Sequence, residues 1–250
     1  MRTEIYVQAR MGSTRLPGKV MKPVLGKPLL EYLIERLHRV KEADDCAILT
    51  TTNPRDDVLV NFCEKLGVAC YRGPEEDVLE RYYRVALERK PDAIVRITSD
   101  CPLIDPDEVD KVIRTFQESF PTYDYVSNSI ERTYPRGLDA EIFSYNALEQ
   151  AFYEAKAPFE REHVTPYIYN HPKLFRFKNV SANEILNSHR WTVDTEEDFM
   201  LIRLILESLY PGNPNFKMQD ILNLLKLHPE WSLINAHIIQ KALPTDADSI

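Results

Sequence analysis

A short stretch near the start of the chain combines glycines with several cations and contains no acidic residue. Its glycines are Gly12, Gly18 and Gly26, three of only seven in the chain. Because glycine has no Cβ atom, the backbone can fold tightly and direct successive N–H groups at an anion, while arginine and lysine add fixed positive charge. This composition predicts a local phosphate-binding loop. The cations of the stretch are Arg10, Arg15, Lys19, Lys22 and Lys27.

The spacing within this loop excludes two common nucleotide-binding motifs. A Walker A loop has four residues between its glycines and a serine or threonine after its lysine. Here five residues separate Gly12 from Gly18, and Val20 follows Lys19. The G-x-G-x-x-G pattern of dinucleotide-binding folds is also absent. Neither P-loop hydrolysis nor NAD binding is therefore favoured.

Residues 9–19 read A-R-M-G-S-T-R-L-P-G-K, and G-K-P-L follows at 26–29. Over nearly its whole length the chain resembles the cytidylyltransferase family that activates acidic sugars. A segment with His228-Pro229 and Ile234-Asn235 is similar to the end of the spore coat polysaccharide biosynthesis protein F group within that family. The resemblance implies a triphosphate site in which Arg15 and Lys19 take part in catalysis. The loop residues expected to bind the nucleotide are Arg10, Gly12, Ser13, Arg15 and Lys19.

Two aspartates are candidate metal ligands. Asp100 follows a predicted strand and begins the run D-C-P-L at 100–103, which resembles the family's D-x-P-L metal motif. Asp194 lies in V-D-T-E-E-D at 193–198, which resembles the family's V-D-T-x-E-D motif. Magnesium takes few carboxylates and completes its coordination with phosphate oxygens and water. The resemblance implies that Asp100 and Asp194 hold Mg²⁺ against the α-phosphate and that Asp100 is catalytic.

Further contacts to the nucleotide are expected at the edge of the same sheet. Gln8 and Ala9 precede the loop, and Ser99 ends another predicted strand. Members of this family carry an arginine followed by a proline near the nucleotide. Arg72 resembles that arginine, although Gly73 stands between it and the proline in this chain. Plain packing within strands is the alternative role for these residues.

Two charged segments resemble the acceptor side of this subgroup, namely P-R-G-L-D-A-E at 135–141 and E-R-E-H-V-T at 160–165. Arginine forks suit carboxylates and phosphates, so the expected acceptor is an acidic deoxy-sugar or a sugar phosphate. Solvated surface charge is the alternative role for these segments. The candidate acceptor residues are Arg136, Asp139, Glu141, Arg161 and His163.

The elements that must position these residues alternate between apolar runs and amphipathic stretches. Helices between successive strands predict parallel pairing, and hence a doubly wound, mostly parallel α/β sheet, which the resemblance identifies as the nucleotidyltransferase type. Ligands of such sheets bind beyond the carboxyl ends of the strands. The predicted strands of the first half are residues 5–9, 46–50, 68–71 and 93–98, and the predicted helices are 28–40, 53–66, 77–88 and 106–116.

The pattern is looser in the second half. The predicted strands there are 123–127, 140–143, 175–180 and 191–193, and the predicted helices are 145–155, 160–170 and 196–210. Helices at 218–227 and 232–243 predict an appended helical hairpin, and 244–250 a frayed tail. We therefore expect a nucleotidyltransferase domain at 1–210, with a nucleotide-binding half (1–118) and an acceptor-binding half (119–210), and a C-terminal helical extension at 211–250.

Composition limits the partners. A net charge of −8 disfavours a protein that coats nucleic acid, which usually needs a basic surface. No apolar run approaches the ~18 residues of a membrane-spanning helix, and no signal peptide is recognised, so we expect a cytoplasmic protein without membrane insertion. A homodimer is a hypothesis from the resemblance.

The expected function is that of an enzyme, a nucleotidyltransferase that joins an acidic sugar or sugar phosphate to a nucleotide, with CTP as the donor and Mg²⁺ as the cofactor. One alternative is a sugar 1-phosphate nucleotidyltransferase that uses GTP or another nucleoside triphosphate, because the same loop and metal chemistry serve either acceptor. The other is a non-catalytic nucleotide-binding scaffold, which would show no metal-dependent turnover.

Overall fold

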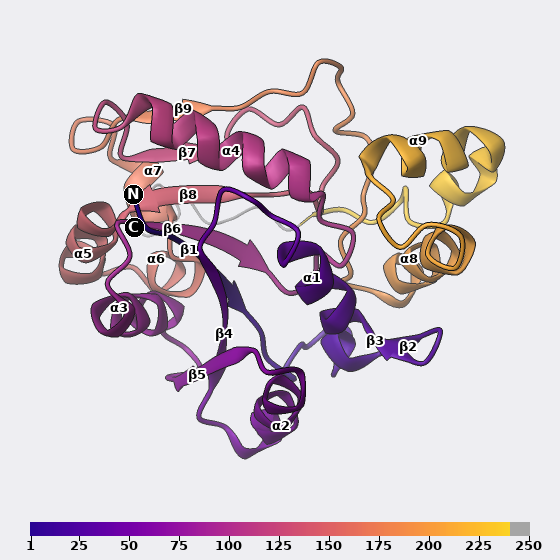
Figure 1. The fold of residues 1–250 in the computed structure, drawn as a ribbon, viewed down its shortest axis with the longest axis horizontal. Coiled ribbons are helices and arrows are strands. Elements are labelled where there is room, and N and C mark those ends of the chain that lie inside the picture. Colours follow the sequence, from indigo (N-terminus) through magenta and orange to yellow (C-terminus); the bar gives the residue numbers. More distant parts are fainter. Residues whose placement is uncertain (241–250) are drawn as a thin grey trace.

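The computed structural model describes residues 1–240, and its centre is a seven-stranded sheet in the order β5-β4-β1-β6-β8-β7-β9 (Figure 1). Neighbouring strands pair in parallel from β5 to β6 and again between β7 and β9, whereas β8 pairs antiparallel with β6 and β7. The predicted mostly parallel α/β sheet is confirmed. The strands are β1 (Thr3–Gln8), β4 (Asp45–Thr51), β5 (Ala69–Gly73), β6 (Ala93–Thr98), β7 (Tyr125–Ser127), β8 (Glu141–Ser144) and β9 (Phe177–Asn179), with a separate ribbon of β2 (Pro23–Val24) and β3 (Lys27–Pro28).

Helices cover both faces of the sheet because its central strands are apolar on both sides. In β1, Ile5 and Val7 pack on one face and Tyr6 on the other, as the alternation of a strand requires. The helices that pack with Ile5 and Val7 are α1 (Leu29–Leu37), α2 (Asp57–Leu66) and α4 (Pro106–Ser119). Those that pack with Tyr6 are α3 (Val78–Arg89), α5 (Tyr145–Glu154) and α7 (Pro166–Asn170), and α6 (Pro158–His163) contacts α3.

A third apolar cluster lies at one end of the molecule, where α8 (Glu196–Leu209) and α9 (Met218–Leu227) lie together, coloured orange to yellow in Figure 1. Leu16 and Trp191 are buried in the same cluster. The loop after β1 and the C-terminal helices are therefore packed into one core. The division of the chain at residue 210 stays a prediction.

The C-terminal segment differs from the expected helical hairpin. After α9 the chain forms only the short 3₁₀ helix η3 (Pro229–Leu233), and residues 234–240 are not helical. The predicted helix at 232–243 is therefore wrong over the residues that the structure describes. Residues 241–243 and the expected tail at 244–250 lie outside them.

Two further elements differ from expectation. The predicted helix at 160–170 is two short helices, α6 and α7, because buried Val164 has a positive φ of 72° and Pro166 begins the second helix. The predicted strand at 191–193 is not a strand, and its neighbour Arg190 forms a single bridge with Arg136. Within residues 1–240, no helix has the length and apolar character needed to cross a membrane.

Candidate active site

A cleft of about 840 Å³ lies at the carboxyl ends of β1 and β6, the place expected for a ligand in a sheet of this kind. This volume suits a nucleotide-sized ligand. The walls of the cleft include the loop after β1, the end of β6, the acceptor-side segments and the segment before α8. The predicted site residues that line it are Gln8, Ala9, Arg10, Ser13, Arg15, Lys19, Ser99, Asp100, Arg136, Asp139, Glu141, His163 and Asp194.

The loop after β1 is folded back on itself and fixed at its base. The Met11 carbonyl accepts bonds from the N–H groups of Ser13 and Gly18, both at 3.0 Å, and Gly18 has a positive φ of 68°. Buried Asp56, at the end of the 3₁₀ helix η2 (Pro54–Asp56), accepts a bond from Met11 N at 2.7 Å. This anchoring holds the loop cations along one side of the cleft.

Gly12 does not line the cleft. A Cβ atom at Gly12 would lie 2.6 Å from Nη2 of Arg55, so the glycine leaves room for this guanidinium against the loop. Arg55 in turn pairs with Glu75. The absent side chain of Gly12 thus allows a packing contact, and its expected contact with the nucleotide stays a prediction.

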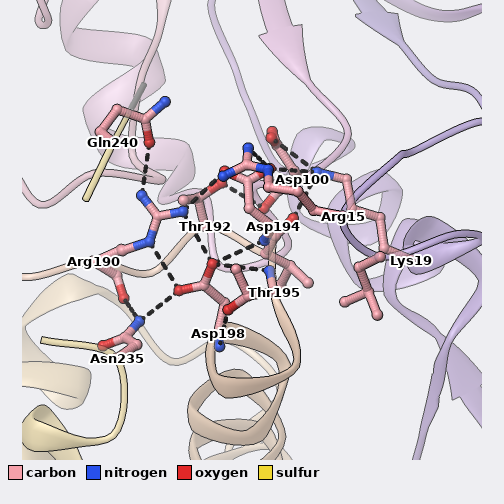
Figure 2. A network of polar contacts seen from close by, with 12 residues as sticks. Arg15, Lys19, Asp100, Arg190, Thr192, Asp194, Thr195, Asp198, Asn235 and Gln240 are labelled. Atoms are coloured by element: carbon pink, nitrogen blue, oxygen red, sulfur yellow. Dashed lines mark hydrogen bonds and ion pairs between the residues drawn. The ribbon is translucent and has the colours of Figure 1, made fainter. Parts of the chain in front are cut away.

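Lys19 joins the two candidate metal carboxylates (Figure 2). Its Nζ lies 2.9 Å from Asp194 Oδ1 and 3.3 Å from Asp100 Oδ2, and it donates to the Val193 carbonyl at 2.6 Å. Arg15 Nη2 approaches the same Asp194 oxygen at 3.0 Å. Lys19 begins the 3₁₀ helix η1 (Lys19–Met21), and buried Val20 anchors that turn in the core.

The backbone, rather than the side chains alone, brings the two aspartates together. Val193 N donates to the Asp100 carbonyl at 2.8 Å, and Thr192 Oγ1 donates to the same oxygen at 3.1 Å. Asp194 immediately precedes Thr195, the N-cap of α8, which forms a capping box with Asp198. The irregular segment before α8 therefore closes on the turn after β6.

The cations of the loop change the protonation equilibrium of this cluster. Burial alone would raise the pKa of Asp100, but the Lys19 charge and hydrogen bonds to the carboxylate outweigh it and lower the pKa to about 2. Burial would likewise lower the pKa of Lys19, but the charges of Asp100 and Asp194 raise it. At neutral pH the cluster therefore consists of a protonated amine and an ionised Asp100 carboxylate.

The donor atoms of this cluster fit magnesium better than zinc. Asp100 and Asp194 supply only two hard carboxylate oxygen ligands, whereas zinc sites use three or four protein ligands that are mainly histidine and cysteine. Across residues 1–240, no group of three or more His, Cys, Asp and Glu side chains is placed to hold a metal. A pair of aspartates suits an ion whose remaining ligands are phosphate oxygens and water.

At the base of the cleft, Gln8 and Arg96 from neighbouring strands lie side by side. Arg96 Nε donates to Gln8 Oε1 at 3.0 Å, and the Arg96 guanidinium pairs with Glu141 on β8. Glu141 also accepts bonds from Tyr125 and Thr165, at 2.6 and 2.7 Å. Its acceptors are thus largely occupied by the protein.

Arg72 lies outside the main cleft, at a smaller pocket of about 190 Å³. Its guanidinium donates to the carbonyls of Thr51 and Asn53 at 2.8 and 3.0 Å and pairs with Asp57 at 2.7 Å. These contacts fasten the end of β5 to the turn after β4. The expected contact of Arg72 with the nucleotide therefore has no structural support.

Of the acceptor-side arginines, Arg136 faces the cleft and Arg161 does not. No hydrogen bond or ion pair within residues 1–240 engages the Arg136 guanidinium, whereas neighbouring Arg132 pairs with Asp139. Burial and the charges of Arg132 and Arg190 lower the pKa of Arg136, although Asp139 partly offsets them. Arg136 is therefore a cation in a cation-rich part of the cleft, which favours an anionic ligand.

Arg161 is turned away from the cleft. Its Nε and Nη2 donate to Asp77 Oδ2 at 2.8 and 2.6 Å, and its Nη1 donates to the Phe152 carbonyl at 2.6 Å. These contacts join α6 to the start of α3 and to α5, so the geometry of Arg161 argues for a structural role instead of the expected acceptor contact.

His163, at the end of α6, does line the cleft, and burial together with the charge of Arg96 lowers its pKa.

Several residues that line the cleft were not predicted from the sequence. Arg96 could have been found, because an arginine inside the otherwise apolar strand 93–98 requires a partner. Gln240 had no such signal, since its partner Arg190 is 50 residues away in the chain. The cleft-lining residues that were not predicted include Arg81, Arg96, Tyr125, Arg132, Tyr169, Thr192 and Gln240.

Comparisons with known proteins agree with the resemblance of this sequence to the cytidylyltransferase family. A family model described as Cytidylyltransferase matches residues 5–208. The spore coat polysaccharide biosynthesis protein SpsF of Bacillus subtilis is 35% identical over 231 residues, 90% of this chain and 94% of that protein. A 3-deoxy-manno-octulosonate cytidylyltransferase of Chlamydia trachomatis is 26% identical over 208 residues, 79% of each. The structure of a cytidylyltransferase from Leptospira borgpetersenii is 32% identical, with a TM-score of 0.89 over 97% of this chain and 100% of that one.

Proposed function

The chain belongs to the cytidylyltransferase family, and on this basis we propose that it transfers the CMP group of CTP to an acidic sugar or a sugar phosphate in surface polysaccharide or glycoconjugate biosynthesis. A phosphate oxygen or a hydroxyl oxygen of the acceptor attacks the α-phosphorus, and a hydroxyl group loses its proton to solvent. The bond from that phosphorus to the bridging oxygen of the β-phosphate breaks, and pyrophosphate leaves. The single observation that carries this proposal is the convergence of Arg15, Lys19, Asp100 and Asp194 in one cleft.

In this proposal the loop cations stabilise charge on the triphosphate. Arg10 and Arg15 keep side chains that are 37% exposed in the cleft wall, so both can reach an anion. Lys19 is more enclosed, and its three donors already meet Asp100, Asp194 and the Val193 carbonyl. Lys19 therefore binds a phosphate oxygen of the leaving pyrophosphate by releasing one of these acceptors. Pre-aimed cations of this kind stabilise a leaving pyrophosphate without reorganisation of solvent.

Asp100 and Asp194 would hold Mg²⁺, which supplies Lewis-acid neutralisation of phosphate charge and helps to orient in-line attack. The backbone bonds from residues 192 and 193 to the Asp100 carbonyl fix the relative position of the two carboxylates. This arrangement gives the ion a preorganised pair of ligands.

Arg136 supports an acidic acceptor. Its guanidinium faces the cleft close to Arg132 and Arg190 and is not paired within the part of the chain that the structure describes. A carboxylate or phosphate on the sugar would complete the hydrogen bonds of such a fork. Neutral sugars would leave it unsatisfied and should be poor substrates.

Pyrophosphate release provides the test. The purified protein is incubated with Mg²⁺, each of CTP, GTP, ATP and UTP, and a panel of acidic, phosphorylated and neutral sugars. We expect turnover with CTP and an acidic or phosphorylated sugar, and loss of turnover after removal of the divalent cation. Turnover with GTP and a sugar 1-phosphate would support the alternative guanylyltransferase, and nucleotide binding without turnover across the panel would support a scaffold.

The predicted homodimer and cytoplasmic location stay predictions, which sedimentation and cell fractionation would test.

A further inference from the structure

Buried Arg190 connects the candidate metal ligand Asp194 to the first turn of α8 (Figure 2). Arg190 Nε and Nη2 donate to Asp198 Oδ1 and Oδ2 at 2.9 and 3.0 Å, which is the two-pronged pairing that only arginine makes with a carboxylate. Nη2 also donates to Asp194 Oδ2 at 2.9 Å. Arg190 is 8% exposed and Asp198 is fully buried, so solvent screens this pairing little.

The two oxygens of Asp194 thereby face different partners. Oδ2 is held by Arg190, while Oδ1 faces Lys19 and Arg15 at the cleft. Asp194 N also donates to Asp198 Oδ2 at 3.0 Å, so the backbone of Asp194 is fixed as well. Rotation of the carboxylate is therefore restricted, and one chosen oxygen is presented to the cleft.

The C-terminal segment completes this arrangement. Asn235, 3% exposed, donates its single Nδ2 group to Asp198 Oδ1 at 2.8 Å and to the Arg190 carbonyl at 2.9 Å. Gln240 Oε1 accepts from Arg190 Nη1 at 2.7 Å, and Gln240 itself lines the cleft. Every donor atom of the Arg190 guanidinium thus has a partner, and two of the residues around it come from beyond α9.

We propose that Arg190 is a positioning residue for Asp194, and that residues 235–240 of the C-terminal extension lock Arg190 in place. The proposal rests on the proposed function, because it takes Asp194 as a metal ligand. Magnesium demands a near-ideal octahedral geometry, and partners behind a ligand fix its orientation. The C-terminal extension is then part of the catalytic site, because it helps to orient the metal ligand Asp194 although it contributes no ligand itself.

The first test uses Arg190→Lys, which keeps the charge but loses the fork. Mn²⁺ binding to the full chain in the presence of CTP is measured by water proton relaxation, beside steady-state kinetics with Mg²⁺ and the melting temperature. We expect Mn²⁺ affinity and kcat to fall about 10- to 100-fold, the usual effect of removing a partner behind a metal ligand, with the KM for CTP nearly unchanged. A lower melting temperature with unchanged Mn²⁺ affinity and kcat would show a structural role and overturn the proposal.

Asn235→Ala and Gln240→Ala test the lock while leaving Arg190, Asp194 and Asp198 intact, and they decide the question if Arg190→Lys does not fold. Both should weaken Mn²⁺ binding less than Arg190→Lys does. The matched controls are Asn223→Ala and Gln219→Ala on the exposed surface of α9, which should behave as wild type. Lock variants that bind Mn²⁺ as tightly as their controls would refute a role for the C-terminal segment.

Asp194→Asn separates failure of this proposal from failure of the proposed function. If Asp194→Asn keeps wild-type Mn²⁺ affinity and turnover, Asp194 is not a ligand, so its metal role and the positioning role of Arg190 both fail although the protein is still a nucleotidyltransferase. If Asp194→Asn loses both properties while Arg190→Lys keeps both, the proposed function stands and only the positioning role of Arg190 is refuted.

Discussion

Val193 donates its backbone N–H to the carbonyl oxygen of Asp100 at 2.8 Å, and this bond closes the segment before α8 onto the turn after β6. Thr192 strengthens the closure through its hydroxyl group. The distance between the two candidate metal carboxylates is therefore set mainly by backbone contacts. Changes to the carboxylate of Asp100 should consequently affect chemistry more than folding.

Asp100→Asn should reduce turnover by at least about 10- to 100-fold, because it removes a charged ligand and not a core contact. The melting temperature should stay within about 4 °C of wild type, which corresponds to roughly 1 kcal/mol for a chain of this size. Pyrophosphate release and thermal unfolding are the measurements. Asp107→Asn, an exposed aspartate of α4, is the control. Near-normal activity of Asp100→Asn in Mg²⁺ would rule out Asp100 as a ligand.

Lys19→Ala should weaken binding of CTP about 10- to 100-fold, the span of losing one hydrogen bond to a charged group. Binding of CMP should change much less, because the proposed partner of Lys19 is the part of CTP that leaves as pyrophosphate. Calorimetric titration with both nucleotides measures the difference. Lys22→Ala, whose amine pairs with exposed Glu196, provides the matched control. Equal losses for CTP and CMP would place Lys19 at the carboxylate pair alone.

Arg136→Ala should lower kcat/KM for the acceptor by roughly ten- to a thousandfold, since a charged fork that positions the nucleophile is lost at a cost of ~1.5–4 kcal/mol. The KM for CTP should change little. Arg161→Ala is an informative comparison, because its contacts with Asp77 and Phe152 predict lower stability with normal acceptor kinetics. The acceptor assignment fails if the kinetic effect appears in Arg161→Ala or in the KM for CTP.

Gly137→Ala should destabilise the protein by about 2–5 kcal/mol, from backbone strain together with overpacking. Gly137 has a φ of +103°, and a Cβ atom there would lie 2.5 Å from the carbonyl carbon of Trp191. Chemical denaturation measures the change. Gly212→Ala, with nothing within 4 Å of its added Cβ, should change the free energy of unfolding by at most about 1 kcal/mol. Similar stability of the two variants would contradict this close approach.

The sequence alone determined the class of fold and the loop after β1. Both depend on local information, since alternating apolar residues define strands, helical spacing defines the covering helices, and the glycines and cations of the loop are contiguous. Asp100 and Asp194 could be proposed as metal ligands for the same reason, because each lies in a short recognisable motif. The helix predicted at 232–243 shows the limit of this approach, because Asn235 is committed to a buried bond with Asp198 rather than to a helix.

Only the tertiary structure decided which charges pair. Arg161 and Arg136 look alike in sequence, yet one is consumed by Asp77 and the other faces the cleft. Arg190 lies near Asp198 in sequence but is locked by residues 235 and 240 from beyond α9. The strength of an ion pair depends on distance, burial and competing partners, and these follow from how distant segments pack. A local pattern therefore predicts an element, whereas the partner of a charged side chain is settled only when the whole chain is folded.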